Sequence, residues 1–352
     1  MQHHKLLTSS LSSDCLKNQT MPFLSSCCSW YQRLFPGVAL DPASEALMLI
    51  GSQEGLAHAL LACTDPGDAI LMPDLAYASY FGAVKIAGLE TITVPFKRIE
   101  GRFLPDLSCV DDATLLKAER AKILLLNFPN NPTSATADEV YFLKAIDFCK
   151  RHKLLLIHDN PYIDQTYDED HAISPLSLPG GMDVCIELFS ISKSYHLAGF
   201  RCGFALGNKD AIKALEDVKS PIDFNQWVGV QRMAMTCFAL PRERVRADAL
   251  IWKARAKCMT DELRDRCQWI FQMPDSCMYL FGSLPEGFFD DLAFCLELLR
   301  RTGVAISPGR AFGPGGVGCV RFALVQREER LIEAAERIKK ALVEMKVERR
   351  QG

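Results

Sequence analysis

The sequence predicts an α/β fold with a mostly parallel central sheet, followed by a smaller α+β domain at the C-terminal end. Two observations support this prediction. Short apolar runs typical of strands alternate with helical stretches, and this rhythm is typical of a parallel sheet with helices on both faces. Polar residues then follow several of the strands directly, at the sheet edge where such folds bind ligands.

Composition is that of an ordinary globular protein, with 352 residues of which 49% are apolar and 24% charged, and a net charge of −3. No basic block indicates nucleic acid, and no apolar run approaches the roughly 18 residues that span a membrane. The 7 histidines lack metal-ligand spacing, so no metal site is expected. The 14 cysteines form no Cys-x-x-Cys pair, which favours a reducing, cytoplasmic location.

Residues 1–28 are predicted to be an irregular or disordered leader. The segment is rich in serine, has Asp14 as its acidic residue and shows no sustained apolar period. An organelle transit peptide is the alternative, although such peptides carry arginine and this segment has none. A large domain is expected over residues 29–230 and a small C-terminal domain over residues 231–352.

Apolar runs and turn residues predict the elements of the large domain in order. Gly51-Ser52-Gln53-Glu54-Gly55 opens a helix over residues 56–63, and Asp65-Pro66-Gly67-Asp68 forms a turn. Strands are predicted at 69–72, 91–95, 123–127, 154–158, 184–189 and 203–206. Helices are predicted at 84–89, 111–118, 137–152 and 211–218.

A long helical stretch over residues 225–264 is expected to lead the chain out of the large domain. After it, strands and helices alternate again and predict the smaller α+β domain. The predicted strands are 278–284, 304–307 and 317–324, and the predicted helices are 289–302 and 327–348.

Polar residues at the strand ends point to one ligand. Ser190, Ser192 and Arg201 suit a phosphate, because guanidinium matches phosphate oxygens and hydroxyls complete the shell. Lys193, on the same loop, could form a Schiff base with an aldehyde on that phosphorylated ligand. Pyridoxal phosphate (PLP) carries both groups. Asn131 and Asp159 also follow strand ends, so a single pocket can hold them together with Lys193.

Four segments resemble the signature of the PLP-dependent class I/II aminotransferases, the fold-type I enzymes that include aspartate aminotransferase and LL-diaminopimelate aminotransferase. They are Ser190-Ile191-Ser192-Lys193 with Arg201, Asn131-Pro132-Thr133, Asp159-Asn160-Pro161-Tyr162, and Arg321. The similarity runs from about Trp30 to about Leu342, in the order of the family. It implies the three-layer fold-type I architecture and a homodimer.

The resemblance also implies a role for each site residue. Lys193 would hold PLP and move the substrate proton, Asp159 would pair with the pyridine nitrogen, and Tyr162 would hold O3′ with Asn131. Arg321 would grip the α-carboxylate of the substrate, and Asn131 would also contact the substrate. The remaining cofactor contacts would come from the backbone of Ser52, Gln53 and Glu54, the ring of Tyr77, the hydroxyls of Ser190 and Ser192, and Arg201.

The expected reaction is transfer of an amino group from an amino acid to a 2-oxo acid. A C–S β-lyase and an aminocyclopropane-carboxylate synthase-like enzyme share these residues and stay open as alternatives. The family's N-terminal segment has no counterpart before Trp30, so an impaired PLP-binding remnant is a third alternative. The same gap predicts exposed apolar surface on the small domain.

Overall fold

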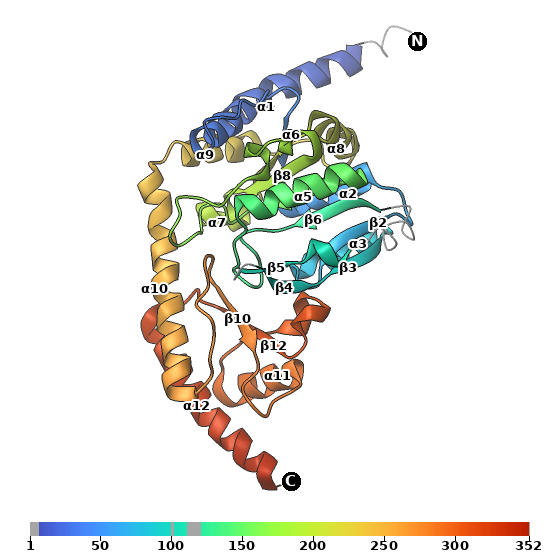
Figure 1. Ribbon diagram of the computed structural model, residues 1–352. Coiled ribbons are helices and arrows are strands. Elements are labelled where there is room, and N and C mark those ends of the chain that lie inside the picture. Colours follow the sequence, from blue (N-terminus) through green and yellow to red (C-terminus); the bar gives the residue numbers. More distant parts are fainter. Residues whose placement is uncertain (1–6, 100–101, 111–120, 352) are drawn as a thin grey trace.

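The computed structural model describes residues 7–99, 102–110 and 121–351 (Figure 1). The helix predicted at 111–118 lies outside these residues. The chain forms a large α/β lobe and then a smaller lobe, and helix α10 (Arg242–Cys267) runs along one side of the molecule between them (Figure 1). Among the described residues no helix is long and apolar enough to cross a membrane.

A seven-stranded sheet in the order β1-β9-β8-β7-β6-β2-β3 forms the centre of the large lobe. Its strands are β1 (Ala46–Leu49), β2 (Ala69–Pro73), β3 (Glu90–Val94), β6 (Ala121–Leu126), β7 (Leu155–Asp159), β8 (Cys185–Ser190) and β9 (Gly203–Gly207). Strand β9 is antiparallel to both its neighbours, and the other pairs are parallel. The prediction of a mostly parallel sheet is therefore confirmed.

Helices cover both faces of the sheet, because apolar side chains alternate along buried strands. In β6, Leu124 and Leu126 belong to one apolar cluster, while Ile123 and Leu125 belong to another. The first cluster contains α5 (Glu139–His152), and the second contains α2 (Ser52–Cys63), α3 (Ala78–Ile86) and α8 (Lys209–Ile222). This is the three-layer arrangement that the resemblance implies.

The irregular leader predicted for residues 1–28 is wrong where the structure describes it. Helix α1 (Leu7–Leu34) runs through this segment, at the end of the large lobe far from the small one (Figure 1). Phe23, Cys27, Trp30 and Tyr31 are buried in the large-lobe cluster, at the spacing of one helix face. The helical period of these apolar residues can be recognised only when residues on both sides of position 28 are considered together. The predicted leader ended at residue 28, and the period was therefore missed.

Trp30 anchors α1 to the sheet. Its ring packs edge-on against Phe189 and Phe204, with centroids 5.4 and 5.5 Å away, and it is 5% exposed. Trp30→Ala is expected to lower the free energy of unfolding by about 3 kcal/mol, because a large buried ring is lost. Urea denaturation would measure this, with the exposed neighbour Gln32→Ala as control. Equal stability of both variants would mean that α1 does not pack on the sheet.

Helix α9 (Val228–Phe238) also belongs to the large lobe, since Val230, Ala234 and Phe238 lie in the same cluster as α1. The large-lobe core thus extends past the boundary expected at residue 230. The helical stretch predicted over 225–264 is interrupted at Pro241, which precedes α10. Proline lacks an amide hydrogen and clashes with the preceding turn, which explains the break.

The small lobe packs three helices on a three-stranded antiparallel sheet in the order β10-β12-β11. Its elements are α10, β10 (Tyr279–Ser283), α11 (Asp291–Thr302), β11 (Ser307–Pro308), β12 (Cys319–Ala323) and α12 (Glu328–Gln351). Phe289 and Leu296 of this lobe are 82% and 58% exposed, and the apolar surface expected from the sequence stays a prediction.

Several short elements connect the larger ones. A hairpin of β4 (Phe96–Ile99) and β5 (Arg102–Pro105) follows β3, and it was not predicted. The short helices are α6 (Gly181–Val184) and α7 (Ile191–Ser194). Single 3₁₀ turns lie at Leu107–Cys109, Pro175–Ser177, Ala198–Phe200, Gly309–Phe312 and Pro314–Gly316.

Candidate active site

A cavity of about 270 Å³ lies at the carboxyl ends of the parallel strands, and residues of both lobes line it. Its lining includes the predicted residues Ser52, Gln53, Tyr77, Asn131, Asp159, Tyr162, Ser190, Ser192, Lys193, Arg201 and Arg321. The chain therefore brings together in one cavity residues that are far apart in the sequence.

Glu54 is the one predicted site residue outside the cavity lining. Its carboxylate accepts a hydrogen bond from the backbone of Ile50 (2.8 Å) and pairs with His58 and with the ammonium of Lys219 (3.3 Å). The side chain is thus engaged beside the cavity. A contact from its backbone amide stays a prediction.

One end of the cavity has the shape and charge that a phosphate needs. Helix α2 starts there after Gly51, whose φ of 87° suits glycine, and a Cβ at Gly51 would lie 2.3 Å from Nη2 of Arg201. The guanidinium thus closes over a bare backbone at a helix N-terminus, which carries partial positive charge. Ser190 and Ser192 face each other nearby, with hydroxyl oxygens 2.8 Å apart.

Asp159 is a buried acid with one oxygen unpaired. The Tyr80 hydroxyl donates to Oδ2, whereas buried Oδ1 has no partner among the described residues. Burial raises the pKa of Asp159 from 3.8 to about 6, although the hydrogen bond from Tyr80 and the proximity of His158 and Ser52 oppose the rise. An unpaired buried oxygen is costly, so it calls for a donor such as a protonated ring nitrogen.

Buried hydrogen bonds hold the ends of β6, β7 and β8 in place beneath the cavity. His158 Nε2 accepts from the backbone of Phe128 (3.2 Å), so Nδ1 carries the hydrogen and donates to Glu187 (2.7 Å). The side chain of Asn127 donates to the backbone carbonyl of Asp159 (2.7 Å) and accepts from the backbone N–H of Asn131 (2.9 Å). These contacts orient Asp159 and Asn131, which lie at adjacent strand ends.

Lys193 lies just after β8, in the short helix α7. Burial lowers the pKa of its amine, and the positive charges of Arg321 and Arg201 lower it further, whereas Cys277 opposes the shift. The ammonium nitrogen is 5.7 Å from the ring centre of Tyr162. A lysine with a lowered pKa can act as a nucleophile and can accept a proton, the two roles predicted for Lys193.

Arg321 enters the cavity from β12 of the small lobe. Its guanidinium carbon lies 4.4 Å from the ring centre of Tyr279 and 4.5 Å from that of Phe312, and Nη1 donates to Oδ1 of Asn131 (2.7 Å). Buried Nε has no partner among the described residues. This leaves a donor for a carboxylate, and the Asn131 amide nitrogen stays available for O3′.

Sequence reasoning missed several residues of the lining, namely Ser79, Tyr80, Asn127, Pro161, Ala198 and Tyr279. Asn127 could have been found, because it follows β6 directly, as Asp159 ends β7. Tyr80 packs edge-on against Tyr77 (5.7 Å), and only the folded α3 reveals that it reaches Asp159. Tyr279 begins a small-lobe strand, and no sequence pattern placed it at the cavity.

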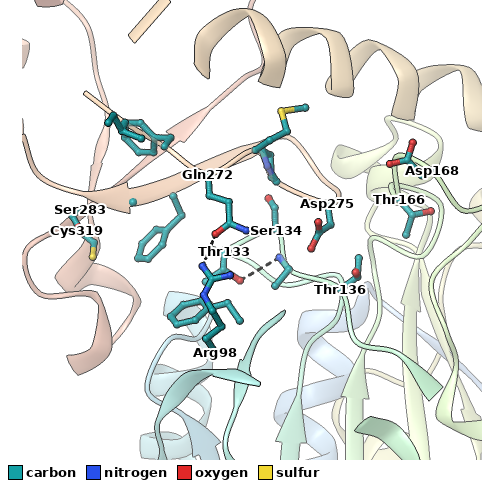
Figure 2. A pocket seen from close by; sticks show the side chains of 18 of the residues that line it. Arg98, Thr133, Ser134, Thr136, Thr166, Asp168, Gln272, Asp275, Ser283 and Cys319 are labelled. Carbon is teal, nitrogen blue, oxygen red and sulfur yellow. Dashed lines mark hydrogen bonds between the residues drawn. The ribbon is translucent and has the colours of Figure 1, made fainter. Parts of the chain in front are cut away.

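A second cavity, of about 580 Å³, is lined by residues of both lobes, and Thr133 and Ser134 are among them (Figure 2). Arg98 and Gln272 point toward one another there, with Nη2 and Oε1 2.7 Å apart. Its acidic lining residues are Asp168, Glu169 and Asp275. None of the predicted site residues lines it, so its larger volume does not make it the better candidate for the chemistry.

The residues of the smaller cavity fit PLP. The Gly51–Arg201 corner accommodates a phosphate, the unpaired Oδ1 of Asp159 a pyridinium nitrogen, and Lys193 an aldehyde carbon. When bound, PLP supplies an electron sink for the negative charge that develops at the substrate Cα. Asp159 would then be the carboxylate that keeps the ring nitrogen protonated, and Lys193 would be the amine that moves the Cα proton.

Known proteins are similar to the chain over most of its length. Residues 7–338 match the profile of the family described as "Aminotransferase class I and II". The LL-diaminopimelate aminotransferase of Aquifex aeolicus is 38% identical over 317 residues, which cover 90% of this chain and 80% of that protein. The enzyme of that name from Syntrophobacter fumaroxidans is 39% identical over 318 residues, with coverages of 90% and 80%.

A solved structure shares the fold. The probable N-succinyldiaminopimelate aminotransferase from Thermus thermophilus superimposes with a TM-score of 0.87 at 51% identity, covering 93% of this chain and 86% of that one. Family profile, relatives and structure agree with the chemistry of the cavity. The chain belongs to the class I and II aminotransferases, and it is a PLP-dependent enzyme that transfers amino groups.

Proposed function

We propose that the amino donor is a diaminopimelate, either free or N-succinylated, and that a 2-oxo acid accepts the amino group. The observation behind this proposal is the 51% identity to the probable N-succinyldiaminopimelate aminotransferase, together with relatives named LL-diaminopimelate aminotransferase. The two names differ in the group at the far end of the substrate. They share the reacting end, an α-amino acid with a long side chain.

We assign the site residues to this reaction as follows. Arg321 would bind the α-carboxylate, because it lines the cavity beside Asn131 and its buried Nε has no partner among the described residues. Lys193 would accept the proton from the substrate Cα and donate it again as an acid. Asp159 would stabilise a protonated ring nitrogen, while Asn131 and Tyr162 would hold O3′. In the overall reaction the amino group of the donor and the keto oxygen of the acceptor are exchanged, so the donor becomes a 2-oxo acid and the acceptor becomes an amino acid.

A donor panel tests the proposed substrate class. PLP-loaded protein would be assayed with 2-oxoglutarate and free LL-diaminopimelate, N-succinyl-LL-diaminopimelate, aspartate, alanine or phenylalanine. We expect one of the two diaminopimelates to give the highest kcat/KM. A higher value with aspartate or phenylalanine would refute the proposal. Pyruvate release from cystathionine without a 2-oxo acid would instead indicate the β-lyase alternative.

We also propose that the enzyme acts as a homodimer through a surface beside Arg201. Phe200, Phe224 and Trp227 are 48%, 57% and 74% exposed, and Gln226 bonds the backbone carbonyls of Phe200 and Arg201. Exposed aromatic groups of this kind are typical of interfaces. Light scattering should give the dimer mass, and Trp227→Arg should give a monomer. A monomeric wild type would refute this proposal.

A cytoplasmic location stays a prediction.

Replacing Arg321 tests the substrate grip. Arg321→Ala is expected to lower kcat/KM for amino acids by at least about thirtyfold, since loss of a buried charge-assisted pair costs roughly 2 kcal/mol or more. PLP binding should change little. Arg310→Ala is the matched control, because Arg310 is tied to Asp290 and Asp291 on the small lobe. Comparable losses for amino acids and for amines without a carboxylate would contradict the assignment.

A further inference from the structure

Tyr279 touches both halves of the active site at once. Its hydroxyl oxygen lies 2.9 Å from the hydroxyl oxygen of Tyr162, and its ring lies 4.4 Å from the guanidinium carbon of Arg321. The residue is 7% exposed and lines the cavity. Its carbonyl accepts a hydrogen bond from Ser134 (3.0 Å), the residue that follows the Asn131-Pro132-Thr133 segment. The first residue of a small-lobe strand is thus fixed against the large lobe.

The number of hydrogens available shows which of the two hydroxyls, that of Tyr162 or that of Tyr279, donates the hydrogen bond. Each tyrosine hydroxyl has one hydrogen to donate and can accept. If Tyr162 donated to Tyr279, it would have no hydrogen left for the cavity. If Tyr279 donates, Tyr162 keeps its hydrogen for O3′. The positive charge of Arg321 over the Tyr279 ring favours the second arrangement, because it draws electron density from that hydroxyl and makes it the better donor.

The ring contact fixes the plane of Arg321. The guanidinium lies between two aromatic rings, Tyr279 and Phe312, at 4.4 and 4.5 Å. Tyr279 and Arg321 come from adjacent antiparallel strands, where Tyr279 pairs with Ala323 and Phe281 with Arg321. Together with the contacts of Nη1 with Asn131 (2.7 Å) and of Nη2 with Ser307 (3.4 Å), these rings hold the guanidinium in one position at the cavity. A guanidinium held in this way is prepared to bind a carboxylate.

We propose that Tyr279 is a positioning residue with two separable actions: its hydroxyl directs the hydrogen of Tyr162 toward the cofactor, and its ring holds Arg321 in place for the substrate carboxylate. The inference rests on the roles proposed above for Tyr162 and Arg321. It predicts that the hydroxyl can be removed without weakening the binding of a carboxylate, because the hydroxyl and the ring contact different partners.

Three forms of the PLP-loaded protein separate these actions: wild type, Tyr279→Phe and Tyr279→Leu. Tyr279→Phe keeps the ring beside Arg321 and loses the hydroxyl, whereas Tyr279→Leu loses both, so the difference between the two variants reports on the ring alone. Two quantities are measured without turnover. One is the pH midpoint at which the visible absorption of bound PLP changes. The other is the Kd of propionate, which carries a carboxylate but no amine.

Different outcomes are expected for the two variants. Tyr279→Phe should raise the pH midpoint by about half a unit, because a weaker donor at O3′ stabilises the deprotonated cofactor less. Its propionate Kd should stay within about twofold. Tyr279→Leu should raise the midpoint by a similar amount and should also raise the propionate Kd by about three- to tenfold, because the ring beside Arg321 is lost as well.

An unchanged midpoint in Tyr279→Phe would overturn the hydroxyl role, and a propionate Kd in Tyr279→Leu equal to that of Tyr279→Phe would overturn the ring role. Failure of the proposed site assignments looks different. In that case wild-type protein would show no visible band on adding PLP, or borohydride would trap the cofactor on a residue other than Lys193.

Discussion

Lys193→Ala should lower kcat by at least about 10³-fold and remove the pH-dependent visible absorption that PLP acquires in the wild-type protein. The large loss is expected because one amine has two duties. A positioned general base contributes roughly 10²–10⁴-fold, and the covalent hold on the cofactor is lost as well. Burial and the nearby Arg201 and Arg321 lower the pKa of this amine, which increases its neutral fraction at neutral pH.

The exposed lysine at the start of α8 provides the control, since Lys209→Ala changes the same residue type away from the cavity. Borohydride treatment followed by peptide mass spectrometry should place the trapped cofactor on Lys193 in both wild type and Lys209→Ala. A Lys193→Ala enzyme that turned over within tenfold of wild type would refute the assignment of the nucleophile and base.

Much of the large lobe was predictable because its strands are short and buried on both faces. A short, continuous apolar run such as Ile123 to Leu126 is typical of a strand that is buried on both faces. When helical stretches precede and follow such a run, a parallel sheet covered by helices is the expected arrangement. Side chains that follow the parallel strands then converge at one edge, which explains why Asn131, Asp159 and Lys193 could be assigned to one cavity from sequence position.

Helix α1 was missed for a physical reason. Its first turns have few apolar residues, and its burial depends on Trp30 and Tyr31 meeting Phe189 and Phe204, which lie far away in the sequence. Local propensity does not contain such contacts. The same applies to Tyr279, which approaches Tyr162 only because the small lobe folds back over the large one. Both the burial of α1 and the position of Tyr279 thus depend on contacts between segments that are distant in the sequence.

Asp159 links function to stability. In the cofactor-free protein, burial raises its pKa from 3.8 to about 6, so the native state holds the proton more tightly than the unfolded chain does. The resulting stabilisation is fully present below about pH 4 and is lost as the pH rises through about 6. Above that pH the buried carboxylate costs roughly 2–3 kcal/mol relative to an equivalent neutral group.

Asp159→Asn removes this titration and keeps an oxygen to accept from Tyr80. Without cofactor, the variant should be about 2–3 kcal/mol more stable than wild type at pH 8, and the difference should shrink toward zero near pH 4. Its turnover with PLP should fall by about 10²–10³-fold, because a neutral amide cannot hold the ring nitrogen protonated. Urea unfolding of the cofactor-free proteins at several pH values measures the first effect, and steady-state assays the second.

The two effects have opposite signs, which separates them from general damage to the fold. A variant that was merely misfolded would lose both stability and turnover. Added PLP should also stabilise wild type more than Asp159→Asn, since only the carboxylate can pair with a protonated ring nitrogen. If the stability difference between the cofactor-free proteins did not vary between pH 4 and pH 8, Asp159 would not be the buried acid on which this assignment depends, and the partner of the ring nitrogen would have to be sought elsewhere in the cavity.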